Sequence, residues 1–158
     1  MLKGYLQNEL YGDIVEFFNR MKSVGVRPNC FTFPMVLKSC GKMLALQEGE
    51  KVHCFVLKIG YKSNPFVGTT LIDLYSSRGL VENGYKVFCE MIVRNVVVWT
   101  TMISCYISHG NVVSARRLFD LAPDRDTVLW NTMVSGYIEF GDMVAARKLF
   151  EKMPSRDL

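Results

Sequence analysis

Two adjacent stretches of the chain are copies of one another. Residues 96–126 and 127–157 align over 31 positions without a gap, and 16 of those positions are identical. Unrelated segments share few positions by chance, so the chain contains an internal repeat. A repeat of this length is one small unit of structure that must stack on its neighbours, and this requirement constrains the fold more than any other feature.

Each copy has the pattern of two short helices joined by a turn. The apolar residues of the first helix in the second copy fall at helical spacing: Trp130, Met133, Val134, Tyr137 and Ile138. Gly141 is predicted to end this helix in a left-handed conformation, and Asp142 to cap the next one. The apolar residues of the second helix have the same spacing before Pro154 stops it: Ala146, Leu149, Phe150 and Met153.

The same hairpin pattern extends over the rest of the chain, so we expect one all-α solenoid over residues 1–158. Leu2 and Tyr5 take the places of Ile103 and Tyr106, which predicts that the first unit begins partway through its first helix. The predicted units are a truncated repeat 1–29, a long repeat 30–64, and short repeats 65–95, 96–126 and 127–157.

Composition and charge narrow the class of protein. With 49% apolar and 22% charged residues, the chain is typical of a globular protein and not of a disordered one. No apolar run approaches the roughly 20 residues that a membrane span needs. The formal charge of +4 permits a polyanionic partner without requiring one. The five cysteines form no C-x-x-C pair, and we expect them to be small buried hydrophobes in a reducing compartment.

The sequence shows no catalytic or metal-binding pattern. No nucleophile, base and orienting residue have a spacing typical of a catalytic site, and the sequence contains no glycine-rich phosphate loop. We therefore predict that the chain is not an enzyme and holds neither a metal nor a cofactor. His53 with Cys54 suggests a metal pair, but no second pair has ligand spacing. The place of His53 is taken by phenylalanine in the other units, which favours a packed core histidine: Phe18, Phe88, Phe119 and Phe150.

The residues of the units resemble one known family. The stretches VVVWTTMISCYISHGNVVSARRLFDLAPDRD and TVLWNTMVSGYIEFGDMVAARKLFEKMPSRD resemble the short motifs of plant pentatricopeptide repeat proteins. CFTFPMVLKSCGKMLALQEGEKVHCFVLKIGYKSN is similar to the long motif of that family, and GTTLIDLYSSRGLVENGYKVFCEM to the short motif that follows it. The alternation of unit lengths resembles the PLS-type subclass of plant organelles.

This resemblance implies a right-handed superhelix that binds single-stranded RNA, with about one base read by each repeat. In the family the fifth and last residues of a repeat select the base, and the second residue sandwiches it. The resemblance implies three reading pairs: Thr69 with Asn95 for adenine, Thr100 with Asp126 for guanine, and Asn131 with Asp157 for uracil. It implies three sandwiching residues: Phe66, Val97 and Val128. Pro34, paired with Asn64, has no side-chain donor or acceptor. The long unit is therefore expected to act as a spacer and not to recognise a base.

The resemblance also implies a basic residue near the end of each first helix. Lys42 fits this pattern, whereas Ser77, Ser108 and Glu139 do not, so attraction to the RNA backbone is expected to be weak. The resemblance implies RNA-editing or processing factors as further partners, and no membrane is expected as a partner. The implied location is the mitochondrion or the chloroplast, although the N-terminus shows no targeting segment.

Simpler interpretations of the same residues remain open. Asp126 and Asp157 are also typical of turns at the end of a repeat. Thr69, Thr100 and Asn131 are alternatively local caps of the first helices. Trp99 and Trp130 are stacking platforms for bases or, as their place in the apolar stripe favours, core anchors. For the whole chain, the alternative function is that of a helical-repeat scaffold for protein–protein interaction.

Overall fold

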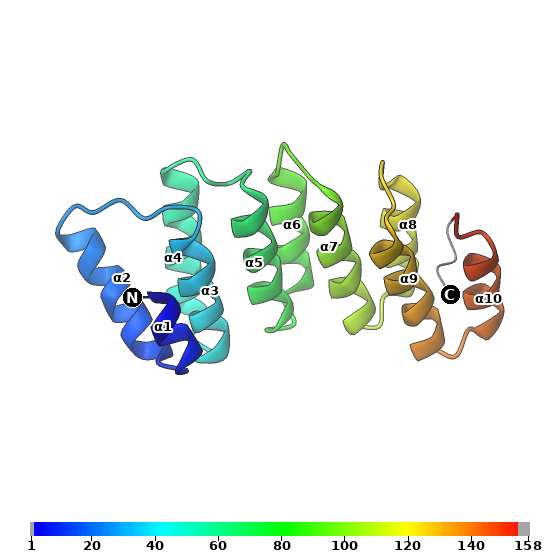
Figure 1. Cartoon of the computed structure of the whole chain (residues 1–158), viewed down its shortest axis with the longest axis horizontal. Helices are drawn as coiled ribbons and strands as arrows, with labels where there is room; N and C mark the ends of the chain where they lie inside the picture. Colours follow the sequence, from blue (N-terminus) through cyan, green and yellow to red (C-terminus); the bar gives the residue numbers. More distant parts are fainter. Residues whose placement is uncertain (1, 155–158) are drawn as a thin grey trace. The chain divides into compact units, whose positions relative to one another are not determined.

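The computed structural model describes residues 2–154, and the regular structure of these residues is entirely α-helical (Figure 1). The helices are α1 (Leu2–Gln7), α2 (Tyr11–Ser23), α3 (Thr32–Lys42), α4 (Leu46–Lys58), α5 (Pro65–Ser76), α6 (Val81–Glu90), α7 (Val96–Ser108), α8 (Val112–Leu121), α9 (Thr127–Glu139) and α10 (Met143–Glu151). No helix among them is long and apolar enough to cross a membrane.

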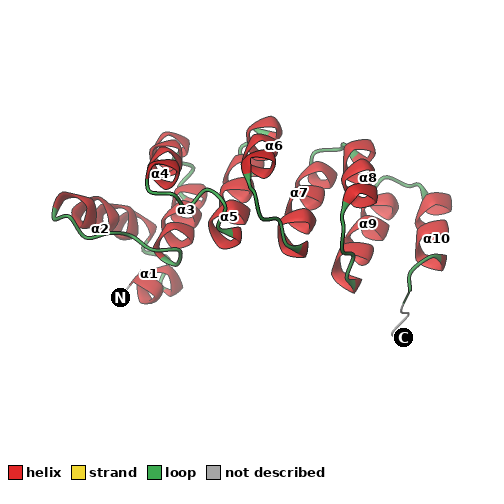
Figure 2. Cartoon of the chain, turned by 90° about the horizontal axis from the view of Figure 1, so that it is seen from above, coloured by secondary structure: helices red, strands yellow, loops and turns green. Residues whose placement is uncertain are grey.

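The chain divides into two compact parts, residues 1–93 and residues 94–158. In the first part α3 pairs with α4 and α5 pairs with α6, and the two hairpins join through packing of α3 against α5. Figure 2 shows α4 and α6 on one side of α3 and α5. In the second part α7/α8 and α9/α10 form hairpins that join through α7 and α9. The prediction of an all-α solenoid of stacked hairpins is confirmed.

The predicted apolar stripes form the core within each part. The stripe of α3 is buried completely: Phe33, Val36, Leu37 and Cys40 each have an exposed fraction of 0%. Where α7 meets α9, a Cβ at Gly136 would lie 2.7 Å from Cδ1 of Ile107. A side chain there would require Ile107 to shift, so Gly136 allows the two first helices to approach closely without displacing Ile107. Trp99 is buried and the ring of Trp130 packs edge-on against Phe119, which supports their interpretation as core anchors.

The end of α9 and the beginning of α10 follow the prediction. Gly141 has a φ of 76°, the left-handed conformation that ends a helix, and the Asp142 carboxylate accepts a hydrogen bond of 2.9 Å from the backbone N–H of Ala145. The short turn between the helices is therefore specified by these two neighbouring residues.

Part of the predicted apolar stripe of the last unit is not buried. Two of its residues have large exposed fractions: Ile138 at 50% and Phe150 at 42%. Their counterparts 31 residues earlier, Ile107 and Phe119, are buried because they pack on Gly136 and Trp130 of the following hairpin. The apolar stripe of a hairpin is thus covered completely only where the described residues include a following hairpin.

The prediction for the cysteines is correct for some and wrong for others. Cys40 and Cys105 are buried, and burial raises the pKa of the Cys40 thiol to about 11. Cys54 and Cys89 are exposed, contrary to the prediction, because each lies on the outer face of a second helix beside a lysine, Lys58 or Lys86. All five cysteines are free thiols.

His53 connects α4 to the neighbouring hairpin. Its Nδ1 lies 2.8 Å from the hydroxyl oxygen of Tyr75, and the two rings meet edge to face. Burial lowers the pKa of His53, because the packed surroundings disfavour the charged ring, although Glu90 and Glu50 favour it. The prediction of a packed histidine in a phenylalanine slot is therefore confirmed, with the ring half-buried.

We expect His53 to make the protein less stable as the pH decreases. The lowered pKa means that the unfolded chain binds a proton more readily, so the free energy of unfolding decreases as the pH drops below about 6.5. The double variant His53→Phe/Tyr75→Phe fills the same space without the titrating ring and should reduce this dependence. Urea unfolding of both proteins between pH 7 and pH 5 measures it, and equal slopes against pH would contradict the assignment.

Candidate nucleic-acid interface

The predicted reading residues lie at or next to the beginnings of the first helices. Thr69, Thr100 and Asn131 lie within the N-terminal half of α5, α7 and α9 respectively. Asn95 and Asp126 immediately precede α7 and α9. Asp157 lies outside the described residues.

The last residues of the units, and not the threonines, cap the first helices. Oδ1 of Asn95 accepts a hydrogen bond of 3.1 Å from the backbone N–H of Val98, and Oδ1 of Asp126 accepts one of 2.8 Å from Leu129. Asn64 caps α5 in the same way. The alternative that assigned the caps to Thr69, Thr100 and Asn131 is therefore wrong, because those residues lie past the first turn, where backbone donors already have helical partners.

The hydroxyls of the two reading threonines donate to their own helices. The Thr100 hydroxyl donates to the carbonyl oxygen of Val96 at 2.8 Å, and that of Thr69 donates to Pro65 at 3.0 Å. Such bonds leave the lone pairs of the hydroxyl oxygen available to accept. Asn131 is exposed, and its amide makes no hydrogen bond to any residue in 2–154. The threonines and the asparagine therefore offer different hydrogen-bonding groups.

The predicted sandwiching residues are exposed apolar side chains. The exposed fraction is 67% for Phe66, 56% for Val97 and 60% for Val128. A fourth residue of this kind, Phe31, is 64% exposed, and its ring centroid lies 6.4 Å from that of Phe66. Phe31 is not among the predicted sandwiching residues, although it is the second residue of its unit, as Phe66 is.

Grooves run between neighbouring first helices within each part. The groove between α7 and α9 has a volume of about 460 Å³, and both Val128 and Asn131 line it. Hydroxyls contribute most of its other polar lining: Ser104, Ser108, Thr132 and Ser135. A predicted sandwiching residue and a predicted reading residue thus face the same hollow.

The groove between α3 and α5 differs in charge. It has a volume of about 650 Å³ and contains Lys38 and Lys42 opposite Asp73. Asp73 remains exposed, and partial removal of water around its carboxyl raises its pKa. In the α7–α9 groove, Ser108 and Glu139 take the place that Lys42 has in the α3–α5 groove. Of these two grooves, only the α3–α5 groove is lined by basic side chains.

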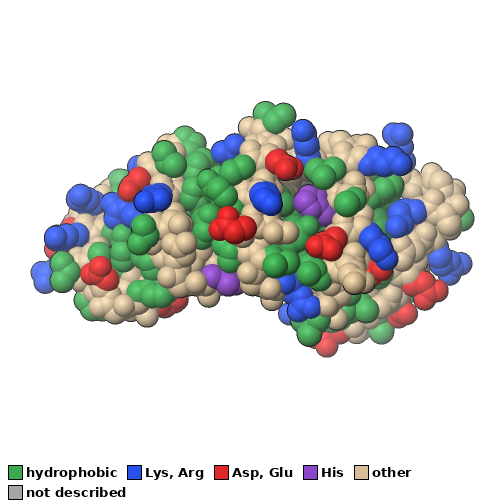
Figure 3. All heavy atoms as spheres, turned by 180° about the vertical axis from the view of Figure 1, so that it is seen from behind, with side chains coloured by type: hydrophobic (Ala, Val, Ile, Leu, Met, Phe, Trp, Pro, Cys, Tyr) green, Lys and Arg blue, Asp and Glu red, His purple; other side chains and the backbone are tan. Residues whose placement is uncertain are grey.

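Charge of one sign does not dominate the face opposite to that of Figure 1. On the side opposite to that of Figure 1, acidic side chains lie among the basic ones (Figure 3). No group of three His, Cys, Asp or Glu side chains within residues 2–154 is arranged to hold a metal ion.

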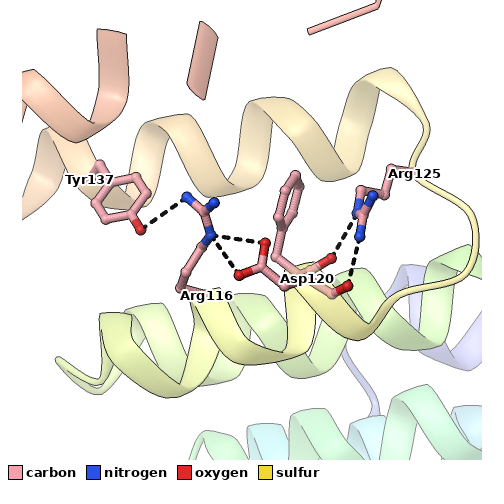
Figure 4. Close-up of polar contacts among 5 residues, drawn as sticks. Arg116, Asp120, Arg125 and Tyr137 are labelled. Carbon is pink, nitrogen blue, oxygen red and sulfur yellow. Dashed lines mark hydrogen bonds and ion pairs between the residues drawn. The ribbon is translucent and has the colours of Figure 1, made fainter. Parts of the chain in front are cut away.

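Arg125 holds the loop that leads into Asp126. Its Nε donates to the carbonyl oxygen of Phe119 at 2.8 Å, and Nη2 donates to that of Asp120 at 2.7 Å (Figure 4). These carbonyls end α8, where a cation is favoured by the helix dipole. Arg116 bridges the same region from Asp120 to the hydroxyl of Tyr137 on α9. The residue before the reading position is therefore fixed to the preceding helix.

Stacked two-helix units with polar side chains beside exposed apolar ones define a helical-repeat protein with a groove-lined face. The PPR repeat model matches residues 69–96, 97–126 and 128–158, and the model of the pentatricopeptide repeat domain matches residues 1–43. The chain belongs to the pentatricopeptide repeat family.

Curated relatives come from Arabidopsis thaliana. The chloroplastic pentatricopeptide repeat-containing protein At4g35130 is 40% identical over 97 residues, which are 61% of this chain and 12% of that protein. The chloroplastic protein At1g08070 is also 40% identical over 97 residues, or 61% of this chain and 13% of the relative. The matched residues therefore span about an eighth of the length of these relatives.

Solved structures share the fold. The crystal structure of the pentatricopeptide repeat protein PPR10 from maize matches with a TM-score of 0.68 at 20% identity, over 92% of this chain and 23% of that chain. PPR10 in complex with an 18-nt psaJ RNA element matches with a TM-score of 0.67 at 22% identity, over 86% of this chain and 21% of that one.

We expect Arg125→Ala to destabilise the second part of the chain. The substitution removes two charge-assisted hydrogen bonds at an exposed helix end and should lower the free energy of unfolding by about 1 kcal/mol. Arg117→Ala is the matched control, since Arg117 is an exposed arginine of α8 without a hydrogen bond to the described residues. Equal urea midpoints for the two variants would refute the anchoring role of Arg125.

Proposed function

We propose that this chain binds single-stranded RNA in a sequence-dependent way along the face formed by its first helices. The observation that carries the proposal is the pairing, at one groove, of exposed Val128 with the unbonded amide of Asn131. A base is a flat apolar ring with a polar edge, so it needs an apolar surface beside a group that donates or accepts hydrogen bonds. The α7–α9 groove offers both.

The other first helices support the same function. Exposed Phe66 and Val97 are the second residues of α5 and α7, and each is followed three residues later by Thr69 or Thr100. The complex of PPR10 with a psaJ RNA element shows that a protein of this fold binds RNA. We propose for this chain the base preferences that the family resemblance implies. They are listed by pair: adenine for Thr69 with Asn95, guanine for Thr100 with Asp126, and uracil for Asn131 with Asp157. The three bases follow one another from 5′ to 3′.

We further propose the repeat organisation and the biological setting. The repeats are a truncated one at 1–29, a long one at 30–64 and short ones at 65–95, 96–126 and 127–157, as in the PLS-type subclass. The names of two relatives place those proteins in the chloroplast, which supports an organelle as the location, either chloroplast or mitochondrion. The process served would be RNA editing, processing or stabilisation, with the corresponding factors as partners.

Binding should prefer single strands and weaken with salt. Unstacked bases are required to enter the grooves, and the formal charge of +4 gives modest attraction to phosphates. Fluorescence anisotropy with a labelled oligonucleotide containing AGU, titrated at two salt concentrations, measures both effects. Equal binding of the single strand and its duplex would contradict the proposal.

The substitution Asn131→Thr should change the base taken by the last unit from uracil to guanine. It replaces the free amide with the hydroxyl that Thr100 carries 31 residues earlier, so the helix should be retained. A correct base contact is worth about 1–3 kcal/mol, or roughly tenfold or more in relative affinity. Competition among four RNAs that differ at this base measures the preference.

The matched control for this experiment is Ser135→Thr. It introduces a threonine into the same groove one helical turn from Asn131, and it should leave the preference for uracil unchanged. If Asn131→Thr also keeps the wild-type preference while circular dichroism shows an intact fold, Asn131 does not read the base.

A further inference from the structure

The two hairpins of the second part meet through specific pairs of residues. Ile107 of α7 lies over Gly136 of α9, where a Cβ would come within 2.7 Å of Cδ1 of Ile107. Arg116 of α8 donates from Nη1 to the hydroxyl oxygen of Tyr137 on α9 at 3.4 Å (Figure 4). The α7/α8 hairpin thus presents an isoleucine and an arginine, and the next first helix meets them with a glycine followed by a tyrosine.

The α9/α10 hairpin presents the same two side chains again, and here they are exposed. Ile138 takes the place of Ile107 and is 50% exposed. Arg147 takes the place of Arg116, and its side chain is 82% exposed. It forms the corresponding ion pair with the residue four positions later, Glu151. We call Ile138 and Arg147 the α9/α10 face, which repeats a surface that the protein already uses for stacking.

Helix α1 carries the matching pair of residues. In the alignment that places Tyr5 at the position of Tyr137, Gly4 takes the position of Gly136. Gly4 is exposed, and a Cβ there would enter open space. Tyr5 lines a hollow of about 150 Å³ whose other lining residues belong to α2. We call Gly4 and Tyr5 the α1 face, because they are the residue types with which α9 covers α7/α8.

Contact between a glycine and a large aliphatic residue also joins two hairpins of the first part. There Gly41 of α3 takes the place of Ile107. Leu74 of α5 takes the place of Gly136, and a Cβ at Gly41 would lie 3.7 Å from Cδ1 of Leu74. The two positions therefore face each other in this contact as well, and glycine at one is paired with a large side chain at the other. By the same pairing, Ile138 fits a glycine.

We propose that a second copy of this chain places its α1 face on the α9/α10 face, so that copies associate head to tail. Ile138 of one copy packs over Gly4 of the other. Arg147 of the first copy donates to the hydroxyl of Tyr5 in the second. The contact removes half-exposed apolar surface from water, which favours association. The two faces differ, so the interface is heterologous, and one copy can use both of its faces.

The proposed contact lacks one element of the contact between α7/α8 and α9. There Phe119 also packs on Trp130, with ring centroids 4.9 Å apart, and the sequence has no residue in the place of Trp130 ahead of Gly4. The docked pair therefore buries less apolar surface than the internal contact does. A small interface of this kind forms reversibly, so association should depend on protein concentration.

Sedimentation equilibrium of the full chain at increasing concentrations tests the proposal. The weight-average mass of the wild type should rise above the 18.0 kDa of one copy. Gly4→Gln fills the open place in α1, and Ile138→Gln puts a polar amide on the opposing face. Each variant should associate at least about tenfold more weakly, because the contact would bury an amide without a partner.

An equimolar mixture of the two variants distinguishes a heterologous contact from a symmetric one. Gly4→Gln keeps an intact α9/α10 face, and Ile138→Gln keeps an intact α1 face. The mixture should therefore form dimers with one copy of each variant, at concentrations where each variant alone is monomeric. Such dimers should not grow further, because both of their outer faces are altered.

The matched controls are Gly12→Gln and Val144→Gln. Both residues take the place of Val113, which is 66% exposed although α9 and α10 follow it. Stacking does not cover this position, so both controls should associate as the wild type does. A Cβ at Gly12 would approach only the end of the Met43 side chain, at 4.0 Å, and circular dichroism checks that every variant is folded.

Wild-type protein that stays monomeric at the highest concentration overturns the proposal. Association of Gly4→Gln with wild-type strength overturns it as well, because the copies would then meet through a contact that does not use α1. A mixture of the two folded variants that remains monomeric excludes the head-to-tail contact, and so does loss of association in either control.

Discussion

A hairpin of two short helices has more apolar surface than it can cover by itself, and contact with the next hairpin solves this problem. In the second part of the chain the contact between α7 and α9 depends on Gly136, which lets Ile107 pack directly on the backbone. Phe119 is covered in the same way by Trp130. Stability is therefore shared between neighbours, and Ile138, which no other described hairpin covers, is exposed.

The same stacking creates the candidate RNA-binding face. First helices that pack side by side place their N-terminal residues in a row and leave a groove between them, as between α7 and α9. The cap residues of α7 and α9, Asn95 and Asp126, are also predicted reading residues of the preceding units. A residue needed for folding is thus held at the place where a base would bind, and Arg125 fixes the loop before it. The hydrogen bonds that cap α7 and α9 therefore involve side chains that we propose to read RNA.

The sequence alone was sufficient to predict the helical hairpins, their buried stripes and the turn at Gly141 and Asp142. These features are local, because helical spacing, a left-handed glycine and a capping carboxylate act within a few residues. Prediction was weaker for Cys54 and Cys89, which share apolar character with buried cysteines but lie on an outer helix face. It also missed Phe31, whose exposure beside Phe66 depends on how α3 and α5 pack.

The repeat written in the sequence determined what kind of protein this is and which side chains are candidates for reading RNA. The tertiary structure alone decided which hydrogen bonds those side chains make within the protein. It showed that Asp126 and Asn95 cap the first helices, that Thr100 donates to Val96, and that the Asn131 amide is left without such a bond. The physical reason is that a residue type specifies the donors and acceptors a side chain owns, whereas only the folded backbone determines which of them remain free.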